Sequence, residues 1–149
     1  MRAVVQRVCR ATVKVHRHTV GQVKHGLLVM AAAAPDDTAE DVRYIAEKVA
    51  HLRVFRDPAD KMNLNVIQVG GGVLVVSAFT VHADARRGRR PSFDTCAAGE
   101  IAEPLVEQLA EAIRAYSLHV ETGRFGAHMR VASVNDGPIC ILLDSRRLF

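Results

Sequence analysis

The sequence predicts an α+β fold: one compact domain over residues 1–149, with two main amphipathic helices packed on a mostly antiparallel, barrel-like β-sheet. Three observations predict it. Strand-like alternation opens the chain, two later segments repeat apolar residues at helical spacing, and further strand-like runs close it. With 49% hydrophobic and 24% charged residues, the chain can bury a substantial core, and no repeat or linker divides it.

Residues 2–32 predict a group of strands. "ATVKV" alternates, "HRHT" has the composition of a turn, "VGQVKHG" runs back, and the apolar "LLVMAA" follows as a buried strand. Residues 36–55 predict a helix, at the start of which Thr38 and Asp41 resemble a capping box. Its apolar residues follow at intervals of three and four: Val42, Ile45, Val49 and Leu52. Residues 56–63 predict a loop.

The second half of the chain continues this pattern. The glycine-led run "GGGVLVVSAFTV", residues 70–81, predicts a central strand covered on both faces. Residues 82–93 predict an arginine-rich loop, and residues 99–116 predict a second helix. One stripe of that helix is apolar: Ile101, Leu105, Leu109 and Ile113. The runs "HMRVASVN" and "ICILLDS" predict the last two strands.

Gly137 and Pro138 lie between these last two runs, where a strand should be starting. Proline cannot donate a hydrogen bond to a sheet, and glycine permits backbone angles that other residues tolerate poorly. The pair therefore predicts either an ordinary turn or a main chain shaped for a functional purpose.

Composition narrows the class of protein. Arg2, Arg7 and Arg10 interrupt the N-terminal segment, which therefore lacks the apolar core of a signal peptide, and the longest apolar run, "GLLVMAAAAP", is too short to cross a bilayer. The three cysteines lie far apart without a CxxC pair, which favours reduced thiols. We therefore expect a cytoplasmic protein without a membrane segment. Cys140, inside "ICILL", is expected to be a small buried hydrophobe.

Positive charge is concentrated in the predicted loop "HADARRGRRPSF", residues 82–93. It carries Arg86, Arg87, Arg89 and Arg90 against the single Asp84, in a chain of net charge +4. Such a loop either faces solvent or contacts phosphate groups.

The usual catalytic motifs are missing: the sequence has no GxSxG, P-loop, HExxH or helix-opening GxGxxG. His16 and His18 could share a face, but no third metal ligand follows them, and we expect no metal. Ser77 and Thr80 interrupt an apolar strand close to its end, where sites are often built. His82 is beyond hydrogen-bonding reach of Thr80 along an extended strand, so these hydroxyls have no obvious general base.

Eight blocks, spread in order over the chain, carry a resemblance to a known family: "MRAVVQRV", "GLLVM", "LRVFRD", "KMN", "VVSAFT", "ADARRGRRPSF", "TGRFGAHM" and "VNDGPI". The chain resembles D-aminoacyl-tRNA deacylases along essentially its whole length. The resemblance implies their fold and a cytoplasmic homodimer that needs no metal or organic cofactor. It also implies hydrolysis of the ester between a D-amino acid and tRNA, which keeps D-residues out of translation.

The resemblance also implies site residues. Ser77, Phe79 and Thr80 match the catalytic stretch of the family, and Ala78, Ala102 and Met129 match positions at its substrate pocket. Gly137 and Pro138 match a cis Gly-Pro pair that enters the partner subunit's site. There its carbonyl groups hold the substrate ammonium and its crowded backbone excludes L side chains. Glycine has no side chain to exclude, so glycyl-tRNA is an expected second substrate. The arginines of the loop are expected to bind tRNA: Arg86, Arg87, Arg89 and Arg90.

Two positions depart from the family pattern. Ala78 replaces a glutamine and Cys140 replaces a threonine, so two sets of hydrogen-bonding groups are lost or weakened. Both losses are tolerable if hydrolysis depends on the backbone and the 2′-hydroxyl of the tRNA, whereas a Thr80 nucleophile would lack a base. Two alternatives stay open: an editing relative that removes small L-residues, and a non-catalytic nucleic-acid-binding paralogue.

Overall fold

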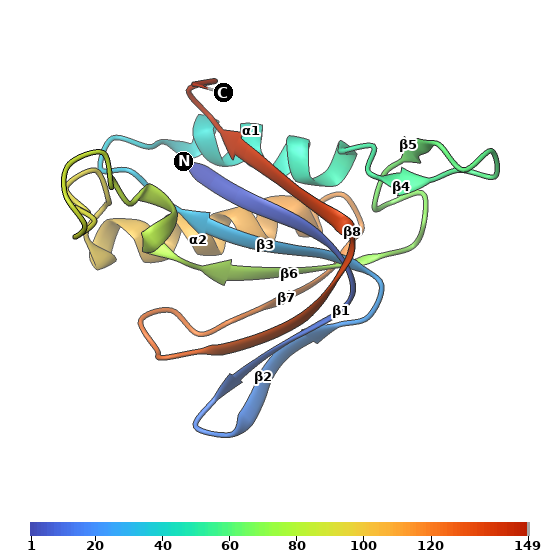
Figure 1. Cartoon of the computed structure of the whole chain (residues 1–149), viewed down its shortest axis with the longest axis horizontal. Helices are drawn as coiled ribbons and strands as arrows, with labels where there is room; N and C mark the ends of the chain where they lie inside the picture. The colour runs from blue at the N-terminus through green and yellow to red at the C-terminus, as the bar shows by residue number, and fades with distance from the viewer. Residues whose placement is uncertain (149) are drawn as a thin grey trace.

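The computed structural model describes residues 1–148, and its chain begins with three consecutive strands (Figure 1). They are β1 (Arg2–Val15), β2 (His18–Val23) and β3 (Gly26–Ala32), which confirms the strands predicted within residues 2–32. His16 and Arg17 form the tight turn between β1 and β2 with positive φ angles of 45° and 72°. His16 therefore lies in an exposed hairpin turn, and His18 follows it as the first residue of β2.

The main sheet is mixed but mostly antiparallel. Its order is β2-β1-β3-β6-β7, with β8 also paired to β1; β6 spans Gly72–Ser77, β7 His119–Thr122 and β8 Arg130–Asp144. The three pairings of β1 are antiparallel, whereas β3–β6 and β6–β7 are parallel. The predicted fold class, with a mostly antiparallel sheet, is confirmed: three of the five pairings are antiparallel and two are parallel.

The two ends of this sheet curl toward each other, so that the sheet is nearly closed. Gly21 of β2 and Thr122 of β7 lie where these ends meet, and a Cβ atom on Gly21 would lie only 2.4 Å from the Thr122 carbonyl oxygen. Any larger residue would push the strands apart, so glycine at position 21 permits this closure.

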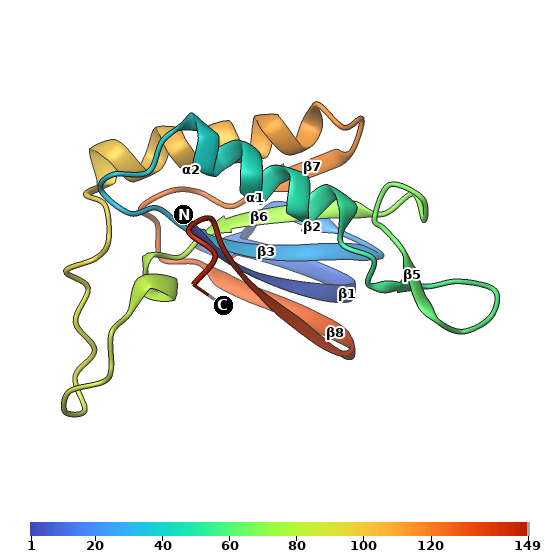
Figure 2. The same cartoon turned by 90° about the horizontal axis from the view of Figure 1, so that it is seen from above.

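Both helices lie side by side on one face of the sheet (Figure 2). They are α1 (Ala39–His51) and α2 (Gly99–Arg114), shorter than predicted by three residues at the start of α1, four at its end and two at the end of α2. The capping box is confirmed: Thr38 Oγ1 accepts from the Glu40 amide, and the Asp41 carboxylate accepts from the Thr38 amide at 2.8 Å.

Two clusters of buried apolar residues stabilise the fold. The larger joins the stripes of both helices to the sheet, and its fully buried members include Ile45, Val49, Leu109 and Ile113. The predicted stripe residue Ile101 is an exception, since it is 42% exposed. A smaller cluster fills the interior of the curled sheet with seven buried residues: Val8, Ala11, Val13, Val23, Leu28, Leu74 and Val76.

Several local predictions were wrong. The predicted strand 70–81 ends at Ser77, and the chain continues as a short 3₁₀ helix, η1 (Phe79–His82). The predicted loop 56–63 takes part in a separate small sheet of β4 (Phe55–Arg56) and β5 (Met62–Leu64). Strand β7 was not predicted. Cys140, expected to be buried, is exposed.

The Gly137-Pro138 segment lies inside one long strand, not between two. Gln6 of β1 pairs with Cys140 of β8, but Val8, two residues further, pairs with Asn135. Residues 136–139 therefore bulge out of the ladder opposite the single residue Arg7. This outcome agrees with the expectation that a proline within a sheet is placed at a bulge.

Candidate active site

A pocket of about 630 Å³ opens where β3 and β6 end. It is walled by the end of β3, the Ser77–Thr80 segment, the first turns of α2, and the loop that leads into β8. Six residues predicted for the site line it together: Ser77, Ala78, Phe79, Thr80, Ala102 and Met129. These positions are up to 52 residues apart in the sequence, so the fold itself gathers them.

Backbone hydrogen bonds place the two hydroxyl-bearing residues at the pocket. The Ala78 amide donates to the Ala31 carbonyl at 2.9 Å, which is the last bond between β3 and the chain leaving β6. The backbone then turns into η1, where the Val81 amide donates to the Ala78 carbonyl at 3.0 Å. Within residues 1–148 the Ser77 and Thr80 side chains form no hydrogen bond, so both hydroxyls are available to a ligand.

Phe79 provides an exposed apolar wall. Its ring is 59% exposed and packs edge-on against Phe93, with ring centroids 5.0 Å apart. Its backbone is held by Cys96, whose Sγ donates to the Phe79 carbonyl at 3.2 Å. Burial raises the pKa of the Cys96 thiol, which therefore stays protonated and able to donate.

The N-terminus of α2 faces the same pocket through Gly99 and Ala102. Its N-cap residue, Ala98, offers no side-chain acceptor, so the first amide groups of the helix lack a side-chain partner. The exposed N–H groups and the positive end of the helix dipole favour negative charge at this wall of the pocket.

Acid–base groups are sparse around the pocket. Among its lining residues within 1–148, His128 is the one titratable side chain, and the sequence reasoning did not single it out, although the block "TGRFGAHM" contains it. His82 does not reach the pocket. It is 5% exposed and lines a different cavity of about 270 Å³, beside Arg2 and Thr95. Burial lowers the pKa of His82, and the positive charges of Arg2 and the N-terminus lower it further.

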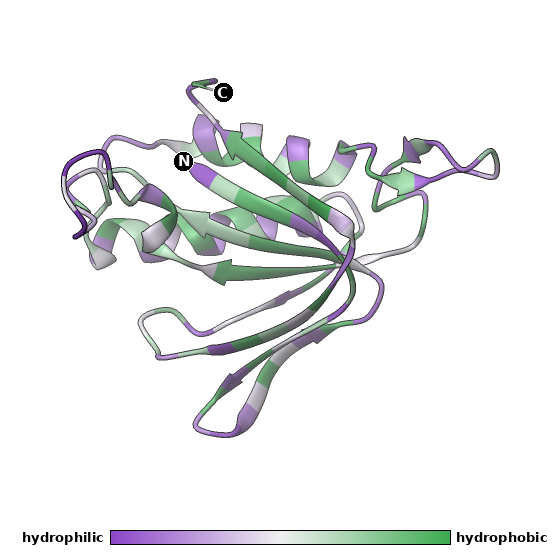
Figure 3. Ribbon diagram, in the orientation of Figure 1, coloured by the Kyte–Doolittle hydropathy of each residue, from purple (hydrophilic) through white to green (hydrophobic). Residues whose placement is uncertain are grey.

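The arginine loop connects η1 to α2 beside the pocket and carries hydrophilic colour in Figure 3. One of its four arginines is already engaged: Arg86 binds Asp84 through Nε and Nη2 at 2.6–3.1 Å. This ion pair lowers the pKa of Asp84 to about 2. The other three, Arg87, Arg89 and Arg90, are exposed and form no ion pair within residues 1–148.

Gly137 and Pro138 do not line the pocket of their own chain. Both are exposed, and the bond between them is cis. Two side chains hold the bulge. Asn135 binds the backbone of Ile139 twice, and Arg7 Nε lies 3.0 Å from the Asp136 carboxylate and 3.1 Å from its carbonyl oxygen.

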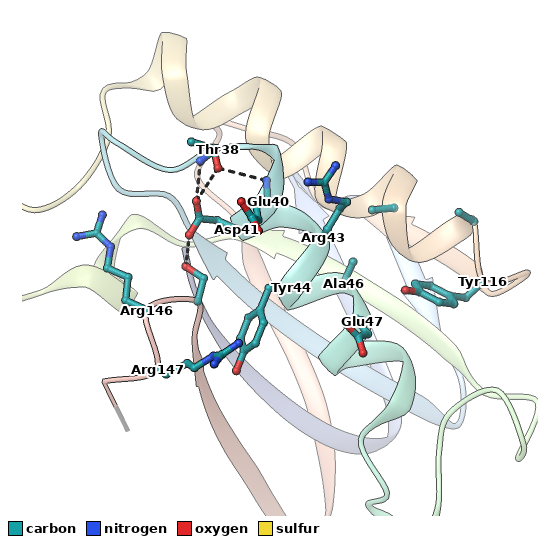
Figure 4. Close-up of a pocket in the computed structure, with 13 residues that line it drawn as sticks. Thr38, Glu40, Asp41, Arg43, Tyr44, Ala46, Glu47, Tyr116, Arg146 and Arg147 are labelled. Carbon is teal, nitrogen blue, oxygen red and sulfur yellow. Dashed lines mark hydrogen bonds between the residues drawn. The ribbon is translucent and has the colours of Figure 1, made fainter.

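A second hollow, of about 840 Å³, lies beside α1 and the C-terminal segment (Figure 4). Its polar groups bind one another: the Asp41 carboxylate accepts from Thr38 and from the Ser145 hydroxyl, and the Arg147 guanidinium lies over the Tyr44 ring. These contacts attach the end of the chain to the start of α1, so we assign this hollow a structural role.

Neither helix of the described chain has the length and apolarity that a membrane crossing requires. Within residues 1–148, no three His, Cys, Asp or Glu side chains are grouped so that they could hold a metal ion.

Taken together, the fold and the pocket define a small α+β protein with an apolar, hydroxyl-bearing pocket at the end of a curled sheet. The family model described as D-Tyr-tRNA(Tyr) deacylase matches residues 4–144. Relatives named D-aminoacyl-tRNA deacylase align over all 149 residues: the protein of Anaeromyxobacter dehalogenans is 56% identical and that of Thermotoga petrophila 53%, each covered completely. The chain belongs to the D-Tyr-tRNA(Tyr) deacylase family.

Solved structures agree on the fold. The structure named c-Myc DNA Unwinding Element Binding Protein superposes with a TM-score of 0.91 at 33% identity, over 97% of this chain and 98% of that one. A probable eukaryotic D-amino acid tRNA deacylase superposes with a TM-score of 0.81 at 16% identity, over 95% of this chain and 97% of that one, and this likeness concerns the fold alone.

Proposed function

We propose that this protein hydrolyses the ester bond between a D-amino acid and the 3′ end of tRNA. The observation that carries the proposal is the pocket: six residues matched to the deacylase site lie around one cavity, in a chain that belongs to the family. Hydrolysis adds water across the ester and releases the free amino acid and the tRNA. Its biological role would be chiral proofreading in the cytoplasm.

The composition of the pocket supports a reaction with little protein acid–base chemistry. A water molecule must attack the ester carbonyl, and negative charge then develops on its oxygen. The positive end of α2 favours that charge, and the Ser77 and Thr80 hydroxyls can orient the ester. With no buried base beside Thr80, we assign proton transfer to water and the tRNA 2′-hydroxyl and give Thr80 a positioning role.

The exposed position of Gly137 and Pro138 supports a homodimer. They lie on a bulge of β8 and do not line the pocket of their own chain, and within residues 1–148 this strand is paired with β1 alone. This strand also exposes a large apolar side chain beyond the bulge, Leu142, which is 55% exposed. A second copy would cover this surface and receive the bulge in its pocket. We expect such an interface to bury more than about 1,000 Å² in total.

In that arrangement the bulge acts as the stereochemical gate. Its carbonyl groups hold the substrate ammonium, and its backbone occupies the space that an L side chain needs. A gate that works by side-chain clash cannot reject glycine, so glycyl-tRNA is a second substrate. Beside the pocket, Arg87, Arg89 and Arg90 bind phosphates of the acceptor end, whereas Arg86 is committed to Asp84.

The test is hydrolysis of D-tyrosyl-, L-tyrosyl- and glycyl-tRNA by one preparation, with its mass measured in solution. Turnover of the D- and glycyl esters by a dimer is the expected result. Turnover of small L-residues would instead identify an editing relative. Binding of nucleic acid without turnover would identify a non-catalytic paralogue, an alternative favoured by the 33% identical structure named as a DNA-element-binding protein.

A further inference from the structure

The first 35 residues hold six arginines and lysines and no aspartate or glutamate. Two of the six find acidic partners from β8: Arg2 Nε lies 2.7 Å from Asp144, and Arg7 Nε lies 3.0 Å from Asp136. The other four are exposed and form no ion pair within residues 1–148: Arg10, Lys14, Arg17 and Lys24. This surplus of positive charge lies outside the arginine loop and was not recognised from the sequence.

The strand register gathers this charge on one face. Arg10, Thr12 and Lys14 alternate along β1 with the buried Ala11 and Val13, so they point away from the interior of the curled sheet. Their partners on β8 are Val134, Ala132 and Arg130, respectively. On the other side of β1, Thr12 pairs with Gln22 of β2, and Lys24 follows β2 directly. We call the surface formed by Arg10, Lys14, Lys24 and Arg130 the hairpin face.

Two positive charges meet directly on this face. Lys14 and Arg130 are cross-strand partners, and neither has an acidic neighbour within ion-pairing distance in residues 1–148. Like charges directly opposite each other destabilise a sheet. On a strand that only faces solvent, such a pair lowers stability without a compensating interaction. An anionic ligand bound between the two side chains would be attracted by both of them.

A groove of about 490 Å³ adjoins the face. Arg10 and Lys24 line it together with Gln22, His25, His119 and the turn of residues 70–72. Gly70 in that turn has nothing within 4 Å of the position a Cβ atom would take, so this side of the turn is open. Glu121 is the acidic side chain at its margin, 3.4 Å from His119 Nε2.

We propose that the hairpin face binds the sugar–phosphate backbone of RNA, as a second contact surface separate from the arginine loop. Spaced cations with hydroxyl and amide side chains among them match the phosphates and sugar hydroxyls of a backbone. The face is linked to the pocket through β8: Met129 and Val131 line the pocket, and Arg130 between them points to the opposite side. The choice of tRNA as the RNA rests on the proposed function.

The arrangement of the molecule fits two contacts with one RNA. In Figure 1 the arginine loop and the β1–β2 hairpin lie on either side of the sheet end at which the pocket opens. A tRNA whose 3′ end enters the pocket must pass one of these surfaces with its acceptor stem. Contacts on the hairpin face would raise the affinity for tRNA but would not discriminate between the amino acids attached to it.

The experiment measures binding of uncharged tRNA between 50 and 200 mM salt. Lys14→Gln/Arg130→Gln removes two charges from the face, and Arg43→Gln/Lys61→Gln removes two exposed charges on α1 and the β4–β5 loop as the matched control. Loss of two phosphate contacts should lower the slope of log affinity against log salt by about two. The drop in affinity over this salt range should then shrink about tenfold, and the control should keep the wild-type slope.

A third variant, Arg87→Gln/Arg90→Gln, tests the arginine loop in the same series. Both the hairpin and the loop variants should raise KM for D-tyrosyl-tRNA more than they lower kcat. Binding of uncharged tRNA tests the hairpin face even if the protein hydrolyses no ester. Failure of the proposed function would be seen separately, as a lack of D-tyrosyl-tRNA hydrolysis by the wild type.

Three results would overturn the proposal. One is an unchanged salt slope in Lys14→Gln/Arg130→Gln. A second is loss of the dimer in that variant, which would place the face in the subunit interface. The third is that Lys14→Gln/Arg130→Gln no longer binds vesicles of anionic lipid but binds tRNA as the wild type does, which would assign the face to a membrane surface.

Discussion

The side-chain amide of Asn135 binds the backbone of Ile139 from both ends: Nδ2 donates to the Ile139 carbonyl oxygen and Oδ1 accepts from the Ile139 amide, each at 2.9 Å. These two bonds replace the ladder pairing that β8 loses at its bulge. They connect the residues on either side of Asp136, Gly137 and Pro138. The geometry of the Gly-Pro pair is therefore held by side chains of its own chain.

We expect Asn135→Ala to loosen the bulge and to lower D-tyrosyl-tRNA hydrolysis more than it lowers stability. Each lost hydrogen bond should cost about 0.5–1.5 kcal/mol of folding free energy. Asn135→Asp keeps the acceptor for the Ile139 amide but lacks the donor, so its activity should lie between those of wild type and Asn135→Ala. The rate of D-tyrosyl-tRNA hydrolysis and the urea unfolding curve, measured on the same samples, give both effects. Wild-type turnover by Asn135→Ala would show that the two bonds do not hold a functional geometry.

Arg7 holds the other side of the bulge. It is 3% exposed, and it binds the Asp136 carboxylate and carbonyl through Nε and the Val54 carbonyl through Nη1. We expect Arg7→Met to leave these buried carbonyl groups without a donor and to destabilise the fold by about 1–3 kcal/mol. Arg7→Lys keeps the charge but not the planar fork, so its stability should be intermediate. Equal denaturation midpoints for Lys and Met variants would show that only the guanidinium geometry matters.

The contacts between α1 and the C-terminal segment predict a dependence of stability on pH. Burial raises the pKa of Asp41, but hydrogen bonds from Ser145 and Thr38 outweigh it and lower the pKa to about 2, from 3.8. The stability that this carboxylate contributes is thus fully present above about pH 4 and is lost as pH falls through about 2. We expect Asp41→Asn to cost about 1 kcal/mol at pH 7, as for a lost helix cap.

The difference in stability between wild type and Asp41→Asn should therefore shrink between pH 4 and pH 2 in thermal melts. Asp60→Asn is the matched control, since Asp60 is 77% exposed and its side chain pairs only with Arg56, which is also exposed. A constant difference over this pH range would mean that Asp41 acts through its shape and not through its charge.

Six of the residues predicted for the site line one pocket, but their arrangement could not be predicted from the sequence. The blocks around Ser77 and Gly137 carried the family resemblance, and the cap at Thr38 has a local signature that the structure confirms. The end of β6 was missed because Phe79 and Val81 continue the apolar alternation of a strand, while the turn after Ser77 depends on hydrogen bonds of Ala78 that leave no sequence pattern. The charge of the hairpin face was missed because Lys14 and Arg130 are 116 positions apart and meet only through the β1–β8 register.

Ala78 offers a test of the departure from the family pattern. It lines the pocket beside two free hydroxyls, at a position where the resemblance implies glutamine. We expect Ala78→Gln to raise the rate of D-tyrosyl-tRNA hydrolysis two- to tenfold, corresponding to one recovered hydrogen bond of about 0.5–1.5 kcal/mol. The preference for D- over L-tyrosyl-tRNA should not change, because the proposed gate is the Gly137-Pro138 backbone. A change in that preference would contradict this division of roles.

At Gly137 the backbone of the bulge accepts no residue with a side chain. Its φ of +147° is a conformation that L-residues rarely adopt, and a Cβ atom there would lie 2.5 Å from the Ile139 amide nitrogen and 2.6 Å from Ile139 Cγ1. The Ile139 amide cannot move aside without breaking its bond to Asn135. We therefore expect Gly137→Ala to displace the bulge and to reduce D-tyrosyl-tRNA hydrolysis at least tenfold.

Gly70→Ala, with φ +62° and open space around the added Cβ, controls for the cost of a positive φ angle, about 1–3 kcal/mol. Hydrolysis, dimer mass and melting temperature are measured on both variants. The pattern expected is a dimer in each, a larger loss of stability in Gly137→Ala, and a loss of activity in Gly137→Ala alone. Full activity of a dimeric Gly137→Ala would remove the bulge from the active site.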